Sequence, residues 1–195
     1  MDESIEDAIK FSKFSFAVEN KGLDAGAFVY FLSQIDFNSY STITKIHTKK
    51  SIHHGREIDF GEKWRKNLYL PLIETPETFN KNIETLISNP GILGSRKYFL
   101  SPEEDHNNFV ISDLEKKIDR LEIILKRKFE KTGFFAGSIY MVSPEYLELL
   151  FERVNLMDLH SRFENGYKTG NLLAHAFERV IGYGIEKFNY RFNFV

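Results

Sequence analysis

The chain has 195 residues, with 26 basic and 28 acidic side chains and a formal net charge of −2. This length fits one compact domain, and the balanced charge excludes the strong basic field expected of a nucleic-acid-binding protein. The chain contains no cysteine, which excludes disulfides, thiolate zinc sites and a cysteine nucleophile. We therefore expect a single soluble domain, residues 1–195, that binds no nucleic acid.

The amino terminus and the hydropathy of the chain bear on its location. Residues 1–7 are acidic, whereas a secretory signal begins with basic and then apolar residues. The sequence also has no run of 18 apolar residues that could cross a bilayer. These features predict a cytoplasmic protein without a transmembrane segment.

The first third of the chain predicts two strands, each followed by polar residues. We expect a short helix over 3–12, a strand over 14–18 and a helix that begins near Ala25. A second strand ends at Ile46. Residues 51–61 are polar and flanked by glycine, which is typical of a loop.

The middle of the chain predicts three helices. A short one runs from about Trp64 to Leu70, and the next begins after the cap Thr75 and stops near 88–91. Residues 112–115 form a capping box for a helix of about five turns. Its apolar stripe, expected to pack in the core, is Leu114, Ile118, Leu121 and Leu125.

The last third of the chain alternates strands and helices. It predicts a strand over 133–142, a helix that begins after Ser143, a helix over 172–184 and a strand over 188–194. In the final strand, aromatic residues alternate with polar ones, as in a strand with one buried face. The elements together predict a three-layer α/β fold, a mixed sheet flanked by helices.

Polar clusters follow the first two predicted strands. Asn20, Gly22 and Asp24 come after the strand over 14–18, and His47 comes after the strand that ends at Ile46. Ligands of open α/β sheets bind outside the carboxyl ends of strands, so the clusters are expected to share one site for an anionic, hydroxyl-rich ligand. Asp24 is equally compatible with a role as the cap of the next helix.

The second cluster is cationic. Lys49 and Lys50 can neutralise a diphosphate, Ser51 adds a hydroxyl, and His47 can donate to a phosphate oxygen or carry a proton. The alternative interpretation is a solvated basic turn. The two histidines that follow, at positions 53 and 54, have no nearby carboxylate, so we expect no metal site there.

Two further groups of candidate residues lie in the carboxyl-terminal half. His175, Glu178 and Arg179 share one helix face, where the glutamate could act as a general base or fix a sugar hydroxyl. The spacing by itself favours the alternative, in which Glu178 and Arg179 are surface charges. Gly137 and Ser138 interrupt an aromatic strand, which indicates close approach by backbone or ligand, or packing against a helix.

The order of these motifs resembles the rhamnan synthesis protein F family over residues 14–186. Proteins of this family take part in building bacterial cell-surface polysaccharides, including O-antigens, lipopolysaccharide and capsules. The matching strings, in order, are Asn20-x-Gly22-x-Asp24, Lys45 to Ser51, Trp64-Arg65 with Leu70-Pro71-Leu72, Phe135 to Ser138, and Leu173 to Arg179.

The resemblance implies a glycosyltransferase-like domain in which a sugar, rhamnose in the named members, passes from a nucleotide-diphospho-sugar to a growing or lipid-linked glycan. The fold implied is the carboxyl-terminal part of a GT-A-like domain, and the chain looks short of the usual amino-terminal nucleotide-binding half. The implied positions are Asn20, Asp24, His47, Lys49 and Lys50 near the donor diphosphate, Trp64 and Arg65 near the following loop, Gly137 and Ser138 on the acceptor side, and His175, Glu178 and Arg179 closing the site.

The resemblance also suggests a mechanism. Where many related transferases carry Asp-x-Asp for a divalent cation, this chain has His47-Thr48-Lys49, so we expect basic side chains rather than a metal cofactor to screen the diphosphate. Glu178, or Asp24, would deprotonate the acceptor hydroxyl. The alternative is a non-catalytic subunit that binds glycan or a companion transferase chain. Either would work in the cytoplasm or peripherally at the inner face of the membrane.

Overall fold

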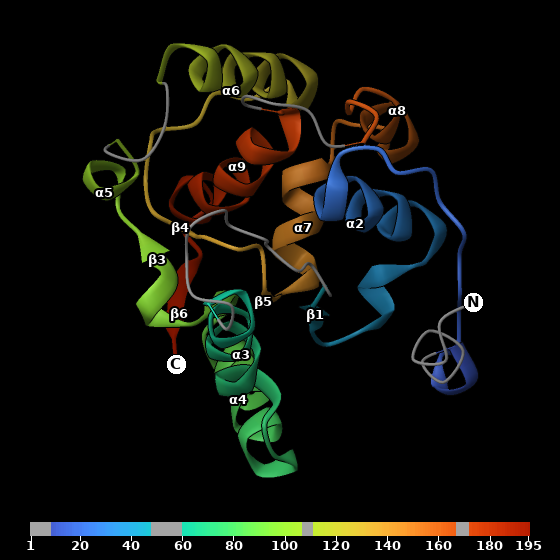
Figure 1. Ribbon diagram of the computed structural model, residues 1–195, viewed down its shortest axis with the longest axis vertical. Helices are drawn as coiled ribbons and strands as arrows, with labels where there is room; N and C mark the ends of the chain where they lie inside the picture. The colour runs from blue at the N-terminus through green and yellow to red at the C-terminus, as the bar shows by residue number, and fades with distance from the viewer. Residues whose placement is uncertain (1–8, 48–59, 107–110, 167–171) are drawn as a thin grey trace.

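A computed structural model describes residues 9–47, 60–106, 111–166 and 172–195 of the chain. A four-stranded mixed sheet lies at its centre, with helices on both faces (Figure 1). The strand order is β1 (Ile43–Lys45), β5 (Tyr140–Val142), β2 (Gly91–Gly94) and β6 (Arg191–Phe194). Strand β5 is antiparallel to β1 and β2, whereas β2 and β6 are parallel.

One face of the sheet is covered by α3 (Phe60–Ile73) and α4 (Pro76–Ser88), which lie below the sheet in Figure 1. As predicted, α4 begins after Thr75, whose hydroxyl accepts a hydrogen bond from the Thr78 amide. The helices and sheet share a small apolar core. Its buried members are Leu68, Leu72, Leu86, Leu93, Ile139 and Met141.

The other face of the sheet carries the main core. Side chains alternate across a strand, so one strand contributes to both cores. Met141 points to the smaller core, whereas Tyr140 and Val142 point to the larger one. The helices that build it are α2 (Leu23–Gln34), α6 (Ile111–Leu125), α7 (Pro144–Phe151), α8 (Leu156–Ser161) and α9 (Leu173–Lys187). The two cores confirm the predicted three layers, a mixed sheet between helices. The predicted stripe of α6 is buried, although the helix begins one residue before Ser112.

A short two-stranded sheet, β3 (Phe99–Leu100) with β4 (Phe134–Phe135), flanks the main sheet. Phe99 and Phe135 pack against Phe192 and Phe194 of β6 with ring centroids 5.0 to 6.0 Å apart. The alternating aromatics of the final strand are therefore used for packing. Remaining short elements are η1 (Phe37–Ser39), η2 (Arg96–Tyr98) and α5 (Pro102–His106).

The predicted strand over 14–18 is wrong. These residues form no strand, and no backbone hydrogen bond joins them to any other described residue. Phe14 and Phe16 stack on each other, and Phe16 also contacts Tyr30 and Phe31 of α2, yet both remain partly exposed. An apolar alternation makes a segment compatible with a sheet, but a neighbouring strand must supply the hydrogen bonds.

Three other predictions need correction. The strand predicted over 133–142 is two strands, β4 and β5, which belong to different sheets. The central strand β2 was not predicted, because its four residues follow a turn signal and are too short to show a period. The helix predicted over Trp64 to Leu70 is longer at both ends.

No helix in the described ranges has the length and apolar character needed to cross a membrane.

Candidate functional site

The turn between β4 and β5 gathers charged side chains from distant parts of the chain. At its centre, Gly137 and Ser138 both have positive φ, 97° and 54°. The Gly137 amide and the Ser138 hydroxyl donate to Oε1 of Glu178 at 2.7 and 3.1 Å. The Ser138 carbonyl accepts from Lys45 Nζ at 2.8 Å, and the Gly137 carbonyl lies 2.8 Å from His47 Nε2.

Asp24 joins this cluster from helix α2. Its Oδ2 lies 2.6 Å from Lys45 Nζ and 3.8 Å from His47 Nε2. Asp24 stands in the first turn of α2, and the residue at the N-cap is Gly22, so the capping alternative for Asp24 is not what the structure shows. The expected proximity of Asp24 and His47 is present, and Lys45 links Asp24 to the turn.

Glu178 is the carboxylate that the turn holds. Burial raises its pKa, the neighbouring Arg179 and the Gly137 amide lower it, and the negative charge of Asp24 raises it again. The net pKa lies above the ordinary glutamate value. A carboxylate with a raised pKa, held close to a histidine and a second carboxylate, is suited to accept a proton from a hydroxyl group.

Arg179 is not a surface charge, contrary to what the spacing favoured. Its side chain is 1% exposed and its guanidinium forms a two-pronged ion pair with Asp105, at 2.7 and 2.5 Å. The guanidinium also lies 4.5 Å from the centre of the Phe134 ring, and Nη1 is 3.6 Å from Oε2 of Glu178. Sequence spacing places Arg179 beside Glu178 but cannot show the buried acid that pairs with it.

Helix α3 borders the turn. A Cβ atom added to Gly137 would come within 2.7 Å of Leu68 Cδ1 and 3.0 Å of Trp64 Cζ2, so the glycine permits this close packing. Packing against a helix, one of the two alternatives for Gly137, is thus present. Arg65 follows on the same helix, half-buried, and its Nε is buried without a hydrogen-bond partner among the described residues.

Other predicted site residues lie apart from the turn or outside the described ranges. Asn20 is exposed, and its carbonyl accepts from the Gly166 amide. Gly22 packs against the Phe163 ring, and its amide donates to the Glu164 carbonyl. His175 faces the start of α9, where Nδ1 accepts from the Leu172 amide. The basic residues Lys49 and Lys50, with Ser51, lie outside the described residues.

Two residues of the cluster were missed as site candidates. Lys45 is 6% exposed although it carries a charge. The sequence did carry a signal for this burial, because Lys45 lies two residues after Ile43 in a predicted strand and therefore shares the strand face of Ile43. Asp105 lies next to Glu103 and Glu104 in a polar segment, and nothing in the sequence distinguishes it from them.

The cluster combines three carboxylates, of Asp24, Asp105 and Glu178, with an imidazole and two buried cations at and beside one turn. It can hold and move a proton at Glu178 and can stabilise negative charge near His47. Within 9–47, 60–106, 111–166 and 172–195, no three histidine, aspartate or glutamate side chains are arranged to hold a metal ion.

Comparison with known proteins gives relatives but no structural neighbour. The chain is 26% identical over 178 residues to two proteins called "Uncharacterized protein WxcX", from Xanthomonas campestris pv. campestris strains B100 and ATCC 33913. Each match covers 89% of this chain and 24% of the relative, so the chain spans about a quarter of the length of these relatives. No solved structure matches the chain. The sequence model of the rhamnan synthesis protein F family matches residues 2–190. The chain therefore belongs to this family, and family membership supports a role in polysaccharide synthesis.

Proposed function

We propose that the chain catalyses transfer of a sugar, rhamnose or a similar hexose, from a nucleotide-diphospho-sugar to a growing cell-surface polysaccharide. Family membership supports a role in polysaccharide synthesis. The observation that carries the catalytic proposal is the Glu178 carboxylate with a raised pKa, held at the β4–β5 turn beside His47 and Asp24. The mixed sheet between helices is compatible with a GT-A-like domain.

In the proposed step, Glu178 takes the proton of the acceptor hydroxyl. The acceptor oxygen forms a bond to the anomeric carbon of the donor sugar, while the bond from that carbon to the diphosphate oxygen breaks. The nucleotide diphosphate leaves with the electron pair, and basic side chains stabilise its charge. We assign this role to His47, Lys49 and Lys50, with Ser51 as a further donor, and we assign no metal ion.

The acceptor is expected to approach Glu178 beside Ser138 and Trp64. Oε1 of Glu178 already accepts two hydrogen bonds, whereas Oε2 is 3.6 Å from the nearest guanidinium nitrogen of Arg179. Oε2 is therefore the oxygen that we assign to the proton. Asp24 keeps Lys45 and His47 in place, which makes it a positioning residue in this proposal.

The decisive experiment replaces Glu178 by glutamine. The amide oxygen can still accept from Gly137 and Ser138, so the turn keeps its support, but the side chain cannot take a proton. We expect turnover of nucleotide sugar to fall by at least about a hundredfold, as for loss of a general base. Unchanged turnover in Glu178→Gln would show that the carboxylate only supports the turn.

A non-catalytic role is the second candidate, because the same contacts also fix the turn within the fold. Lys45 Nζ binds both Asp24 and the Ser138 carbonyl, which is an arrangement that a purely structural network would also use. In that case the chain would bind glycan or a companion transferase chain. Calorimetry with nucleotide sugars separates the two candidates: donor binding by the chain favours the enzyme, and a lack of donor binding favours the subunit.

A further inference from the structure

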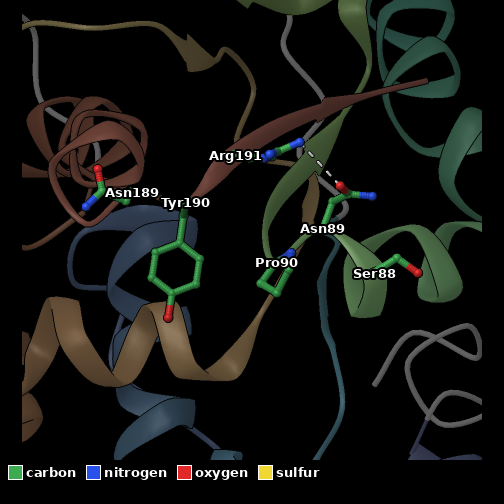
Figure 2. Close-up of a pocket in the computed structure, with 6 residues that line it drawn as sticks. All are labelled: Ser88, Asn89, Pro90, Asn189, Tyr190 and Arg191. Atoms are coloured by element: carbon green, nitrogen blue, oxygen red, sulfur yellow. Dashed lines mark hydrogen bonds between the residues drawn. The ribbon is translucent and has the colours of Figure 1, made fainter.

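A pocket lies at the end of the central sheet away from the β4–β5 turn. Figure 2 shows this pocket, where the segment between α4 and β2 meets the segment between α9 and β6. It has a volume of about 300 Å³. The pairing of Gly91 with Arg191 places it at the start of β2. Toward the other end of β2, Leu93 pairs with Met141 in β5, the strand that follows the β4–β5 turn. The residues that line it are Ser88, Asn89, Pro90, Asn189, Tyr190 and Arg191.

The lining has hydrogen-bonding capacity that the described fold does not use. The side chains of Ser88, Asn189 and Tyr190 have no hydrogen-bond partner among the described residues. Asn89 and Arg191 share one long contact, 3.5 Å from Nη1 to Oδ1, which Figure 2 draws as a dashed line. Hydroxyl, amide and guanidinium groups therefore remain available to a ligand from both sides of the pocket.

The pocket also offers two rings. In Figure 2 the Tyr190 and Pro90 rings lie on either side of a gap, with Asn89 and Arg191 at one end of it. One side of Tyr190 is fixed by an edge-to-face contact with Tyr146, with ring centroids 5.4 Å apart. A fixed ring beside free amides is suited to a ligand with an apolar face and hydroxyl edges.

Charge favours a neutral ligand over a phosphate. Helix α4 ends at Ser88 and α9 ends at Lys187, so two helix carboxyl termini, each with partial negative charge, are directed toward this region. Burial raises the pKa of the Tyr190 phenol, and the negative charges of Glu145 and Glu148 raise it further, so these two carboxylates add negative potential at the pocket. Arg191 is the basic side chain of the lining. Hydroxyl groups can donate to carbonyl oxygens, whereas phosphate oxygens would be repelled by them.

We propose that this pocket binds one neutral pyranose unit of the acceptor glycan, away from the transfer site. The inference rests on the proposed function for its choice of glycan. A pocket of about 300 Å³ is at the small end of ligand sites and fits one sugar ring rather than a nucleotide. Its position at the far end of β2 would hold a glycan chain at a distance from Glu178.

The test is a titration of the 15N-labelled chain with a rhamnose oligosaccharide, followed by NMR without nucleotide sugar. We expect saturable shifts of the side-chain amide signals of Asn89 and Asn189. Asn189 has φ 61°, so Asn189→Gly removes the amide and keeps the backbone conformation. This variant should weaken binding about three- to tenfold, as expected for one lost hydrogen bond.

The control is Asn67→Ala, which alters an exposed asparagine of α3 outside the pocket and should leave the affinity unchanged. Shifts with inorganic phosphate but none with the oligosaccharide would overturn the proposal, as would equal binding by Asn189→Gly. Because binding is measured without donor, the result is separate from transfer. A Glu178→Gln variant that stays active, with intact binding in the pocket, would overturn the catalytic proposal and leave the pocket proposal unaffected.

Discussion

Lys45 and Glu178 bind the same residue through opposite charges. Lys45 Nζ donates to the Ser138 carbonyl at 2.8 Å, and Glu178 Oε1 accepts from the Ser138 hydroxyl at 3.1 Å. The lysine comes from the first strand and the glutamate from the last helix, so the turn depends on the complete fold. Removal of either charge is expected to affect both the stability of the chain and the geometry of the candidate site.

Replacement of Lys45 by methionine should lower the free energy of unfolding by about 2–3 kcal/mol. It leaves the Asp24 carboxylate and the Ser138 carbonyl without their buried cation, and the partial exposure of Asp24 keeps the loss below that of a fully buried pair. Urea unfolding measures the effect. The double variant Lys45→Met with Asp24→Asn should recover part of the loss, and strictly additive losses would contradict the coupling.

Replacement of Asp105 by alanine should be more destabilising, by about 3–5 kcal/mol, because the buried Arg179 guanidinium loses its two-pronged ion pair with Asp105 and keeps only the longer contact with Glu178. An exposed pair serves as control. Arg162 and Asp158 lie one helical turn apart with both side chains largely exposed, so Asp158→Ala should cost less than about 1 kcal/mol. Similar thermal unfolding midpoints for Asp105→Ala and Asp158→Ala would show that burial of the Arg179–Asp105 ion pair does not increase its contribution to stability.

The turn should not tolerate a side chain at Gly137. Gly137→Ala combines a positive φ with a contact of 2.7 Å to Leu68, and we expect a loss of about 2–4 kcal/mol. Gly166 is a matched control, since its φ is +60° and an added Cβ meets nothing within 4 Å. Gly166→Ala should cost only the backbone strain, about 1–2 kcal/mol. Calorimetric unfolding of both variants measures the extra loss at Gly137, which combines the contact with Leu68 and the larger φ.

The pH dependence of transfer should show the raised pKa of Glu178. A general base must be ionised, so kcat/KM should rise with pH through a pKa above 4.5, the ordinary glutamate value. If kcat/KM instead rises with pH at the ordinary glutamate pKa, in a pH profile of initial rates, this would argue against Glu178 as the base.

The same raised pKa has a consequence for stability. The folded state holds the Glu178 proton more tightly than the unfolded state, so this contribution is fully present below the unfolded pKa and is lost as pH rises through the folded pKa. The stability of the wild-type chain relative to Glu178→Gln should therefore fall as the pH rises above about 4.5. Denaturant titrations at several pH values check the direction, and a pH-independent difference would contradict it.

The sequence anticipated part of the candidate site. His47 was singled out from its position after a strand and Glu178 from its helix face. Asp24 was singled out because it follows the predicted strand over 14–18, which does not form, yet the fold brings all three residues to one turn. The burial of Arg179 against Asp105 was not predictable, because a charge on a helix face looks the same in the sequence whether solvent or a distant acid faces it. The roles of these residues in transfer remain predictions.

The order of the motifs along the chain identified the family. The amphipathic helices and the three-layer class were also determined by the sequence alone, because the 3.6-residue and two-residue periods and the cap residues are local signals. Only the tertiary structure decided that residues 14–18 stay out of the sheet, that the short β2 lies at its centre beside β5, and that Lys45 pairs with Asp24 in the interior. Strand pairing and the burial of a charge both need a partner from a distant part of the chain. That partner is chosen by the packing of the whole fold.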